Sequence, residues 1–255
     1  FYLVLRGLDS IEDDMAFPVD RKTALLHSFH ECIYQRDWSL DGCGEKEHER
    51  VLLRNFGKVI SVFLSLDEKY QQVIADITKR MGHGMDEFLH RDLVTIEDWD
   101  LYCHYVAGLV GLGLSGLFAR SELESQWFAT ADEASNIMGL FLQKTNIIRD
   151  YLEDAHEGRV FWPKEIWSKH AEEITDFIDP KNSRSALACM NELITNALEH
   201  IPLCIDYMSR LKEPRVFNFC AIPQAMAIAT LARCFNNHQV FEGVVKLRRG
   251  ESVCV

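Results

Sequence analysis

The sequence predicts an all-α protein that folds as a single domain over residues 1–255. Three observations support this prediction. Apolar residues recur with helical spacing through almost the whole chain, and no two alternating apolar and polar segments are joined by a turn signal. With 14 Gly and 6 Pro in 255 residues, no linker divides the chain. A hydrophobic content of 47% at this length allows a substantial core.

In the first third of the chain, the expected helices are separated by a polar loop. The first residues, from Phe1 on, have the pattern of an apolar helix that is already under way. Residues 41–50 form a loop that leads into another helix. Ser65 and Glu68 have the spacing of a capping box, so we expect a helix to begin there. That helix should end near Gly82.

The rest of the chain continues with long helical patterns. Thr95, followed by two acidic residues, starts a helix that runs towards Phe118. Residues 131–155 follow one long helical pattern, and Pro202 bends or restarts the chain after the next helix. Residues 216–235 form a last apolar helix with an internal proline, which should kink it or mark a break.

Composition excludes several classes of protein. A net charge of −12 argues against a general nucleic-acid binder, because phosphate backbones need a basic surface. The eight cysteines include no Cys-x-x-Cys pair, so we expect reduced core thiols and neither a zinc site nor a disulfide framework. The longest apolar run, residues 106–118, is shorter than the roughly 20 residues of a membrane span. Both ends are abrupt, so we expect a fragment, with an anchor or a further site segment outside it.

The acidic pattern Asp-x-x-Glu-Asp occurs twice in the chain. The first acidic motif consists of Asp9, Glu12 and Asp13, and the second acidic motif of Asp150, Glu153 and Asp154. Residues three and four apart share one face of a helix, so each motif should present its three carboxylates together. Such carboxylates repel one another unless a cation lies between them.

An arginine precedes each motif, Arg6 before the first and Arg149 before the second. Mg²⁺ commonly bridges carboxylates to phosphates, and arginine matches phosphate oxygens bidentately. Two such motifs that face each other would hold diphosphates from two sides. The simpler alternative is a pair of solvated helix faces. The apolar residues around both motifs favour a buried site instead, because six buried carboxylates without counter-charges would be very costly.

Three glycines, at positions 108, 111 and 113, interrupt the apolar segment that follows Tyr102. Each costs roughly 1 kcal/mol relative to Ala in a helix. Such glycines indicate either close helix packing or room for a ligand against the backbone, and their spacing alone does not decide between the two. Together with the apolar helices and the acidic motifs, they favour a channel for a long apolar chain.

Several strings of residues resemble the squalene synthases (farnesyl-diphosphate farnesyltransferases) of the squalene/phytoene synthase family. They are the two acidic motifs, Tyr-Cys-His-Tyr-Val-Ala-Gly at 102–108, Gln-Lys-Thr-Asn-Ile-Ile-Arg-Asp at 143–150, and Phe-Asn-Phe-Cys-Ala-Ile-Pro-Gln at 217–224. The resemblance covers essentially the whole chain. It implies an isoprenoid-synthase helical bundle with a central apolar cavity. It also implies that two farnesyl diphosphates are joined head to head to presqualene diphosphate, which NADPH then reduces to squalene, the first committed step of sterol biosynthesis.

The resemblance also implies residue roles. The magnesium ligands would be Asp9, Glu12, Asp13, Asp150 and Asp154, with Glu153 in support. Tyr102 matches an acid–base residue and Phe219 an aromatic that faces carbocations, although from sequence alone both fit ordinary core positions. The NADPH and diphosphate end would be formed by Arg6, Asn146, Arg149, Lys246 and Arg248. For Lys246 and Arg248, the sequence alone favours a basic helix end that balances the helix dipole.

The same resemblance implies cofactors, partners and location. Two molecules of farnesyl diphosphate are the substrates, and Mg²⁺ and NADPH are the cofactors. The protein would be a monomer at the endoplasmic reticulum membrane, with its catalytic domain facing the cytosol and a C-terminal anchor outside this chain. The family's N-terminal Ser-Arg-Ser-Phe segment is also absent, which puts the activity of this fragment alone in doubt.

Three alternatives remain open at this point. A phytoene or dehydrosqualene synthase shares both acidic motifs but performs no reduction. A di-iron carboxylate protein would use Glu-x-x-His pairs, which occur at Glu45–His48 and Glu87–His90, although both pairs lie in charged surroundings. A non-catalytic helical binding module would explain an apolar cavity but would leave the inward carboxylates without a purpose.

Overall fold

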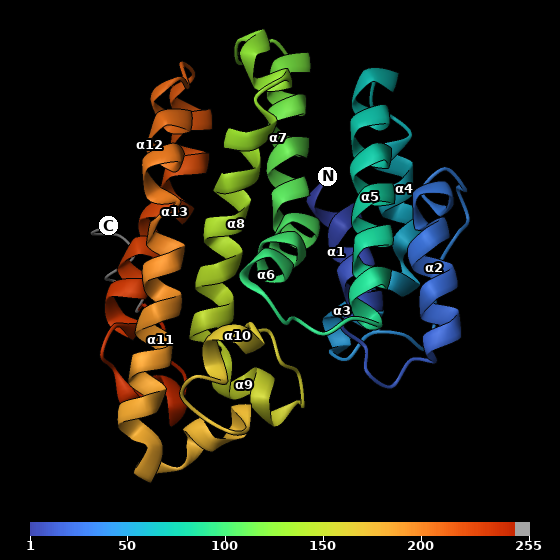
Figure 1. The fold of residues 1–255 in the computed structure, drawn as a ribbon. Coiled ribbons are helices and arrows are strands. Elements are labelled where there is room, and N and C mark those ends of the chain that lie inside the picture. Colours follow the sequence, from blue (N-terminus) through green and yellow to red (C-terminus); the bar gives the residue numbers. More distant parts are fainter. Residues whose placement is uncertain (248–255) are drawn as a thin grey trace.

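The computed structural model describes residues 1–247, which fold into helices joined by loops and short 3-10 turns, with no strand among them (Figure 1). The all-α prediction is confirmed. The first helices lie together on one side of the molecule. They are α1 (Tyr2–Glu12), α2 (Val19–Cys32), α3 (Glu47–Arg54), α4 (Phe56–Phe63) and α5 (Glu68–Leu89).

The middle of the chain forms the centre of the bundle, and the last helices cover its other side (Figure 1). The central elements are α6 (Ile96–Cys103), a π-helical turn (His104–Gly108), α7 (Leu109–Arg120), α8 (Asp132–Arg149) and α9 (Tyr151–His156). The outer elements are α10 (Lys164–Trp167), α11 (Ser183–Leu198), α12 (Ile201–Ser209) and α13 (Pro214–Cys234).

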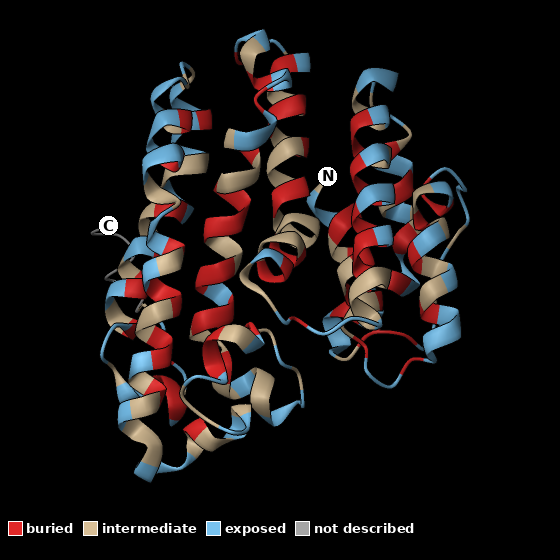
Figure 2. Ribbon diagram, in the orientation of Figure 1, coloured by how far each residue is buried: buried red, intermediate tan, exposed pale blue. Residues whose placement is uncertain are grey.

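Two clusters of buried apolar residues form the core (Figure 2). One lies among α1, α2, α4 and α5 and includes Phe29 and Phe56, and the other surrounds α8 and includes Phe141. The continuous helical segment 96–120 contributes to both, with Trp99 in one cluster and Leu109 in the other. Because one rigid element belongs to both clusters, the two halves pack as one unit.

Helix α5 differs from its prediction at both ends. Ser65 does not cap it: the Ser65 hydroxyl donates a hydrogen bond to the preceding turn (2.7 Å), and Asp67 takes the N-cap position. The helix also continues past Gly82 to Leu89. A Cβ at position 82 would overlap the Leu26 carbonyl of α2, so this glycine allows two helices to approach closely instead of ending one of them.

Helix α3 begins at Glu47, inside the loop expected over residues 41–50. The remaining helix limits agree more closely with the sequence. Thr95 is the N-cap of α6, where its hydroxyl accepts a hydrogen bond from the Asp98 amide (3.0 Å). Pro202 lies in the first turn of α12, and α13 continues through Pro223. Residues 131–155, however, do not form one helix. The chain breaks at Asp150 (φ −92°, ψ 13°), so that α8 and α9 are separate.

The cysteines occupy the positions expected of core thiols. All seven cysteines within residues 1–247 are free, and all but Cys220 are buried. Burial raises the pKa of these thiols, for example to about 11 for Cys43 and to about 12 for Cys204, so they stay protonated at neutral pH. Cys254 lies outside the described residues.

Candidate active site

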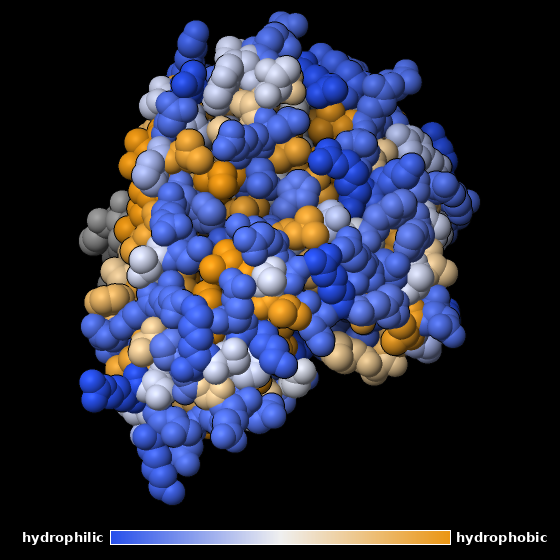
Figure 3. Space-filling view, in the orientation of Figure 1, coloured by the Kyte–Doolittle hydropathy of each residue, from blue (hydrophilic) through white to orange (hydrophobic). Residues whose placement is uncertain are grey.

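A cavity of about 510 Å³ lies among α1, α7, α8 and α13. Most of its wall is apolar. The wall is formed chiefly by Leu5, Met81, Val106, Val110, Leu114, Phe118, Met138, Leu142 and Phe219. Apolar side chains also reach the surface over the central helices (Figure 3). The charged and amide side chains that α1 and α8 contribute are Arg6, Asp9, Gln143 and Asn146, so the cavity has an apolar interior with a polar rim.

Two helical stretches, Ile96–Arg120 and Pro214–Cys234, are long and apolar enough to cross a membrane by length and composition. The apolar run 106–118 lies inside the first stretch, which begins at Ile96 with α6 and is longer than the run seen in the sequence. A core helix passes the same test. Both stretches contribute side chains to the cavity wall, and this accounts for their apolar composition without a membrane.

The glycines of the central segment serve close packing. A Cβ on Gly111 would overlap the Ser135 carbonyl of α8, and one on Gly139 of α8 would overlap the Ala107 carbonyl in return. Gly108 is blocked in the same way by the Asn136 side chain. Gly111 and Ala107 also line the cavity, so tight contact with α8 and a smooth cavity wall occur at the same place.

The π-helical turn interrupts the helix directly after Tyr102 and Cys103. π-Helical turns are rare and occur mostly at functional sites. Its side chains are tied to the surrounding helices: His104 Nδ1 lies 2.7 Å from Asn136 Oδ1, and the Tyr105 hydroxyl donates to Glu87 (3.1 Å).

The first acidic motif occupies the end of α1. Arg6 pairs with Asp9 (3.2 Å) and with the buried Glu49 of α3 (2.5 Å). Burial, and next the charge of Asp13, raise the pKa of Asp9 to about 7 and that of Glu12 to about 8, and burial also raises the pKa of Asp13. Burial and mutual repulsion therefore disfavour the charged forms of these carboxylates.

The second acidic motif occupies the break between α8 and α9. Arg149 makes two hydrogen bonds to Asp150, at 2.8 and 2.5 Å. Burial is the main cause that raises the pKa of Asp154 to about 7. Glu153, in contrast, is exposed, so the prediction of six inward carboxylates was wrong for this residue. Asp150 and Asp154 are half-buried, so Glu153 is the one acid of this motif that is exposed.

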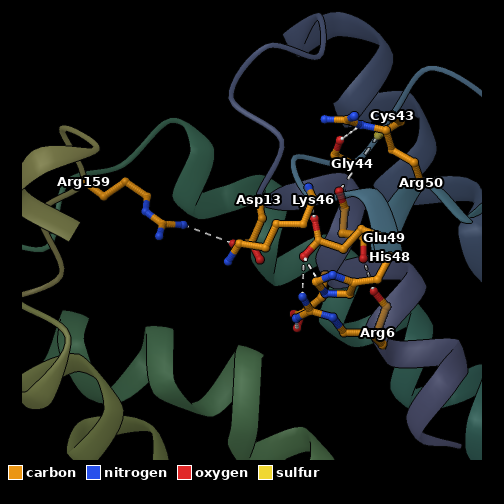
Figure 4. A network of polar contacts seen from close by, with 11 residues as sticks. Arg6, Asp13, Cys43, Gly44, Lys46, His48, Glu49, Arg50 and Arg159 are labelled. Carbon is orange, nitrogen blue, oxygen red and sulfur yellow. Dashed lines mark hydrogen bonds and ion pairs between the residues drawn. The ribbon is translucent and has the colours of Figure 1, made fainter. Parts of the chain in front are cut away.

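One side chain contacts both motifs, and sequence reasoning missed it. Arg159, in the loop after α9, pairs with Asp13 (3.2 Å) and with Asp154 (3.2 Å). Figure 4 shows it reaching Asp13 from one side while Arg6 and Glu49 lie on the other. Lys22 was also missed: it is buried, and its ammonium group donates to the Glu12 carbonyl (2.6 Å).

Tyr102 lies beside the first acidic motif. It is buried and stacked on Phe161, with ring centroids 5.1 Å apart. Burial, and after it the charge of Glu12, raise its pKa well above the ordinary tyrosine value. No hydrogen bond joins its hydroxyl to another residue in the described part of the chain, so the hydroxyl is free for an incoming partner.

The remaining predicted residues do not all lie at the cavity. Phe219 and Asn146 line the cavity, and Phe219 keeps 56% of its surface exposed there. Lys246 is exposed in a separate surface pocket beside Arg233 and does not line the main cavity. Arg248 lies outside the described residues.

The two Glu-x-x-His pairs do not form a metal centre. His48 is 71% exposed, and Glu87 is held by Arg91 (2.6 Å). Within residues 1–247, no three His, Cys, Asp or Glu side chains converge as they stand on a metal ion, and the acidic motifs are held by arginines. Their donors are all carboxylate oxygen atoms, and such donors fit a hard cation such as Mg²⁺.

An all-helical bundle that encloses an apolar cavity beneath acidic and arginine side chains is suited to a long apolar chain with an anionic end. Comparison with known proteins gives the particular family. The profile of the squalene/phytoene synthase family matches residues 1–251, and the chain belongs to that family.

The relatives are similar along the whole of this chain. It is 58% identical over 253 residues to a squalene synthase of Rattus norvegicus and 56% identical over 255 residues to one of Dictyostelium discoideum. The alignments cover 99% and 100% of this chain, but the chain spans only 60% and 61% of the length of these curated relatives. A solved structure of TcSQS in complex with a ligand superposes with a TM-score of 0.97 at 47% identity, covering 99% of this chain and 74% of that one.

Proposed function

We propose that the protein to which this chain belongs joins two farnesyl diphosphates head to head to presqualene diphosphate and then reduces it with NADPH to squalene. The observation that carries the proposal is the apolar cavity whose rim holds Arg6 and Asp9, with the second acidic motif linked to the first through Arg159. The similarity to squalene synthases along the whole chain supports it. We also propose that the protein acts at the endoplasmic reticulum membrane, as expected from its resemblance to squalene synthases.

The carboxylates that would hold Mg²⁺ are Asp9, Glu12, Asp13, Asp150 and Asp154. When bound, Mg²⁺ supplies positive charge to the diphosphate as it departs. The chain itself contributes Arg6 at the rim and Arg149 beside Asp150, and guanidinium groups can orient a diphosphate bidentately. Because these donors are fixed before the reaction, they stabilise the developing charge without reorganisation.

The cavity protects what remains after the diphosphate departs. An allylic cation in water is captured by solvent, and an apolar wall excludes that solvent. The Phe219 ring offers a negative face that stabilises a cation and does not react with it. The neutral Tyr102 hydroxyl, which has no partner among the described residues, would pass on the proton lost when the cyclopropane ring forms.

The proposal is tested with the full-length protein. It is incubated with farnesyl diphosphate and Mg²⁺, with and without NADPH, and the products are identified. Squalene with NADPH and presqualene diphosphate without it are expected. Dehydrosqualene or phytoene as the product in both incubations would instead identify a synthase without the reductive step.

The acidic motifs have their own test. Asp150→Asn should lower the rate of the first half-reaction by about 10²–10³, which is typical when one group that stabilises developing charge is removed. Asp206→Asn is the matched control and should keep full activity, because Asp206 is an exposed aspartate of α12 that pairs with Arg210. Near-full turnover by Asp150→Asn would exclude the diphosphate site.

We further propose that Lys246 and Arg248 bind the phosphates of NADPH. Replacing both with alanine should spare the first half-reaction and weaken NADPH at least tenfold, because charge-assisted contacts to phosphate contribute about 1.5–3 kcal/mol each. Presqualene diphosphate should therefore accumulate. An unchanged apparent affinity for NADPH would remove both residues from the cofactor site.

A further inference from the structure

We propose that Arg159 is a resident counter-cation: it holds the two acidic motifs together until Mg²⁺ displaces it, and then donates to the diphosphate. This inference rests on the proposed function, since it takes the motifs to be the metal site. In the part of the chain that the structure describes, no other basic side chain pairs with carboxylates of both motifs.

The backbone of the second motif itself sets the position of Arg159. Helix α9 ends at His156, and Gly158 adopts a left-handed conformation (φ +72°). The Arg159 amide then donates to the Asp154 carbonyl (2.8 Å), and the Gly158 amide to the Ala155 carbonyl (3.2 Å). These two bonds form a Schellman turn, which brings the arginine back beside the motif that precedes it.

The guanidinium group is surrounded by carboxylates in excess of its charge. It pairs with Asp13 of α1, with Asp154 of α9, and with Glu157 (2.5 Å). Its charge also opposes the rise in the pKa of Glu12. A divalent cation that binds the same carboxylate oxygens has to take them from this guanidinium group, so the two cations compete.

The side chain is not fully satisfied in this position. Its Nε–H group is buried and has no hydrogen-bond acceptor. An orphaned N–H group is costly and gains an acceptor when an anion arrives. The guanidinium group lies over the Phe161 ring, 5.6 Å from the centroid, and that ring stacks on Tyr102. One ring, Phe161, therefore contacts both Arg159 and the residue proposed to move the proton.

The test measures two affinities that should change in opposite directions. Mg²⁺ alone, and then inorganic pyrophosphate in saturating Mg²⁺, are titrated calorimetrically into the metal-free full-length protein and its Arg159→Gln variant. The variant should bind Mg²⁺ about fivefold tighter, because two competing ion pairs are gone. It should bind pyrophosphate about tenfold more weakly, because a bidentate donor is lost. If Arg159 only supported the structure, the variant would bind both Mg²⁺ and pyrophosphate more weakly than the wild type.

Two variants keep the test informative. Arg159→Lys keeps the positive charge but lacks the planar guanidinium group that can donate two parallel hydrogen bonds. Its Mg²⁺ affinity should therefore stay near the wild-type value, while its affinity for pyrophosphate falls. Arg54→Gln, which breaks the exposed pair with Asp41 (3.2 Å), controls for net charge and should change neither affinity. Unchanged or weaker Mg²⁺ binding by Arg159→Gln, or pyrophosphate binding that does not fall, overturns the inference and leaves the proposed function standing. A wild-type protein that binds no Mg²⁺ overturns both.

Discussion

Substitution of Lys144 tests how helix α8 packs against α6 and α11. Its side chain is fully buried, yet it carries a charge. The ammonium group forms an ion pair with Asp100 of α6, donates to Asn196 of α11 (2.6 Å), and lies 4.7 Å from the Trp99 ring centroid. One cation therefore joins α8 to the helix that carries Tyr102 and to the outer layer.

The two partners of this ion pair differ in exposure, and the difference sets the expected energies. Asp100 keeps 41% of its side-chain surface exposed, whereas Lys144 keeps none. Breaking a buried ion pair by removing one partner costs about 3–5 kcal/mol, because the other charge stays buried without compensation. Asp100→Ala should therefore cost about 3 kcal/mol, the lower limit, since the pair is partly solvated.

The reverse change should cost less. In Lys144→Met, the flexible thioether fills the volume of the lysine stem, and the remaining carboxylate is already partly hydrated. A loss of about 1–2 kcal/mol is expected, mainly from the hydrogen bond to Asn196. The double variant should be close to Lys144→Met alone, because no charge is left stranded.

Urea unfolding of the full-length variants, followed by circular dichroism at one pH, measures these differences as a double-mutant cycle. The decisive result is which of the two single variants loses more free energy of unfolding. If Lys144→Met destabilises the protein as much as Asp100→Ala does, the stranded-charge reasoning is wrong. Additive losses in the double variant would show that the two side chains do not interact.

Three further predictions concern packing, pH and the reaction. Gly111→Ala should lower the free energy of unfolding by about 3 kcal/mol, because its Cβ would overlap the Ser135 carbonyl, whereas Gly243→Ala, with open space around it, should be nearly neutral in the same thermal melts. In EDTA, the free energy of unfolding should fall as pH rises from about 5 to about 8. The acids with raised pKa in both motifs ionise near pH 7–8 in the folded protein but near pH 4 in the unfolded chain. The folded state therefore binds more protons in this window, and raising the pH favours the unfolded state. A urea midpoint that instead rose with pH would contradict this. Tyr102→Phe should unfold like the wild type but make presqualene diphosphate about 10²–10⁴-fold more slowly. An unchanged rate would show that Tyr102 only packs in the core and takes no part in the reaction.

Local patterns were enough to predict much of this protein. Helical periodicity gave the helices, because the positions that face the core repeat with the period of the helix itself. Thr95 was identified as a cap because an N-cap needs only its own side chain and an amide three residues later. Both acidic motifs and their neighbouring arginines were found for the same reason: these groups are close in the sequence and therefore close in space.

Tertiary structure decided what depends on distant contacts. Gly82 resembles a helix end in the sequence, but the carbonyl of Leu26 on another helix makes it a point of close approach. The break at Asp150 has no local signal that separates it from a continuing helix, and neither has the exposure of Glu153. Arg159 follows a glycine turn in a loop, and its meaning depends on Asp13, 146 residues away in the sequence. A side chain acquires a partner at that distance only when the whole bundle has folded, so no spacing along the chain could have predicted it.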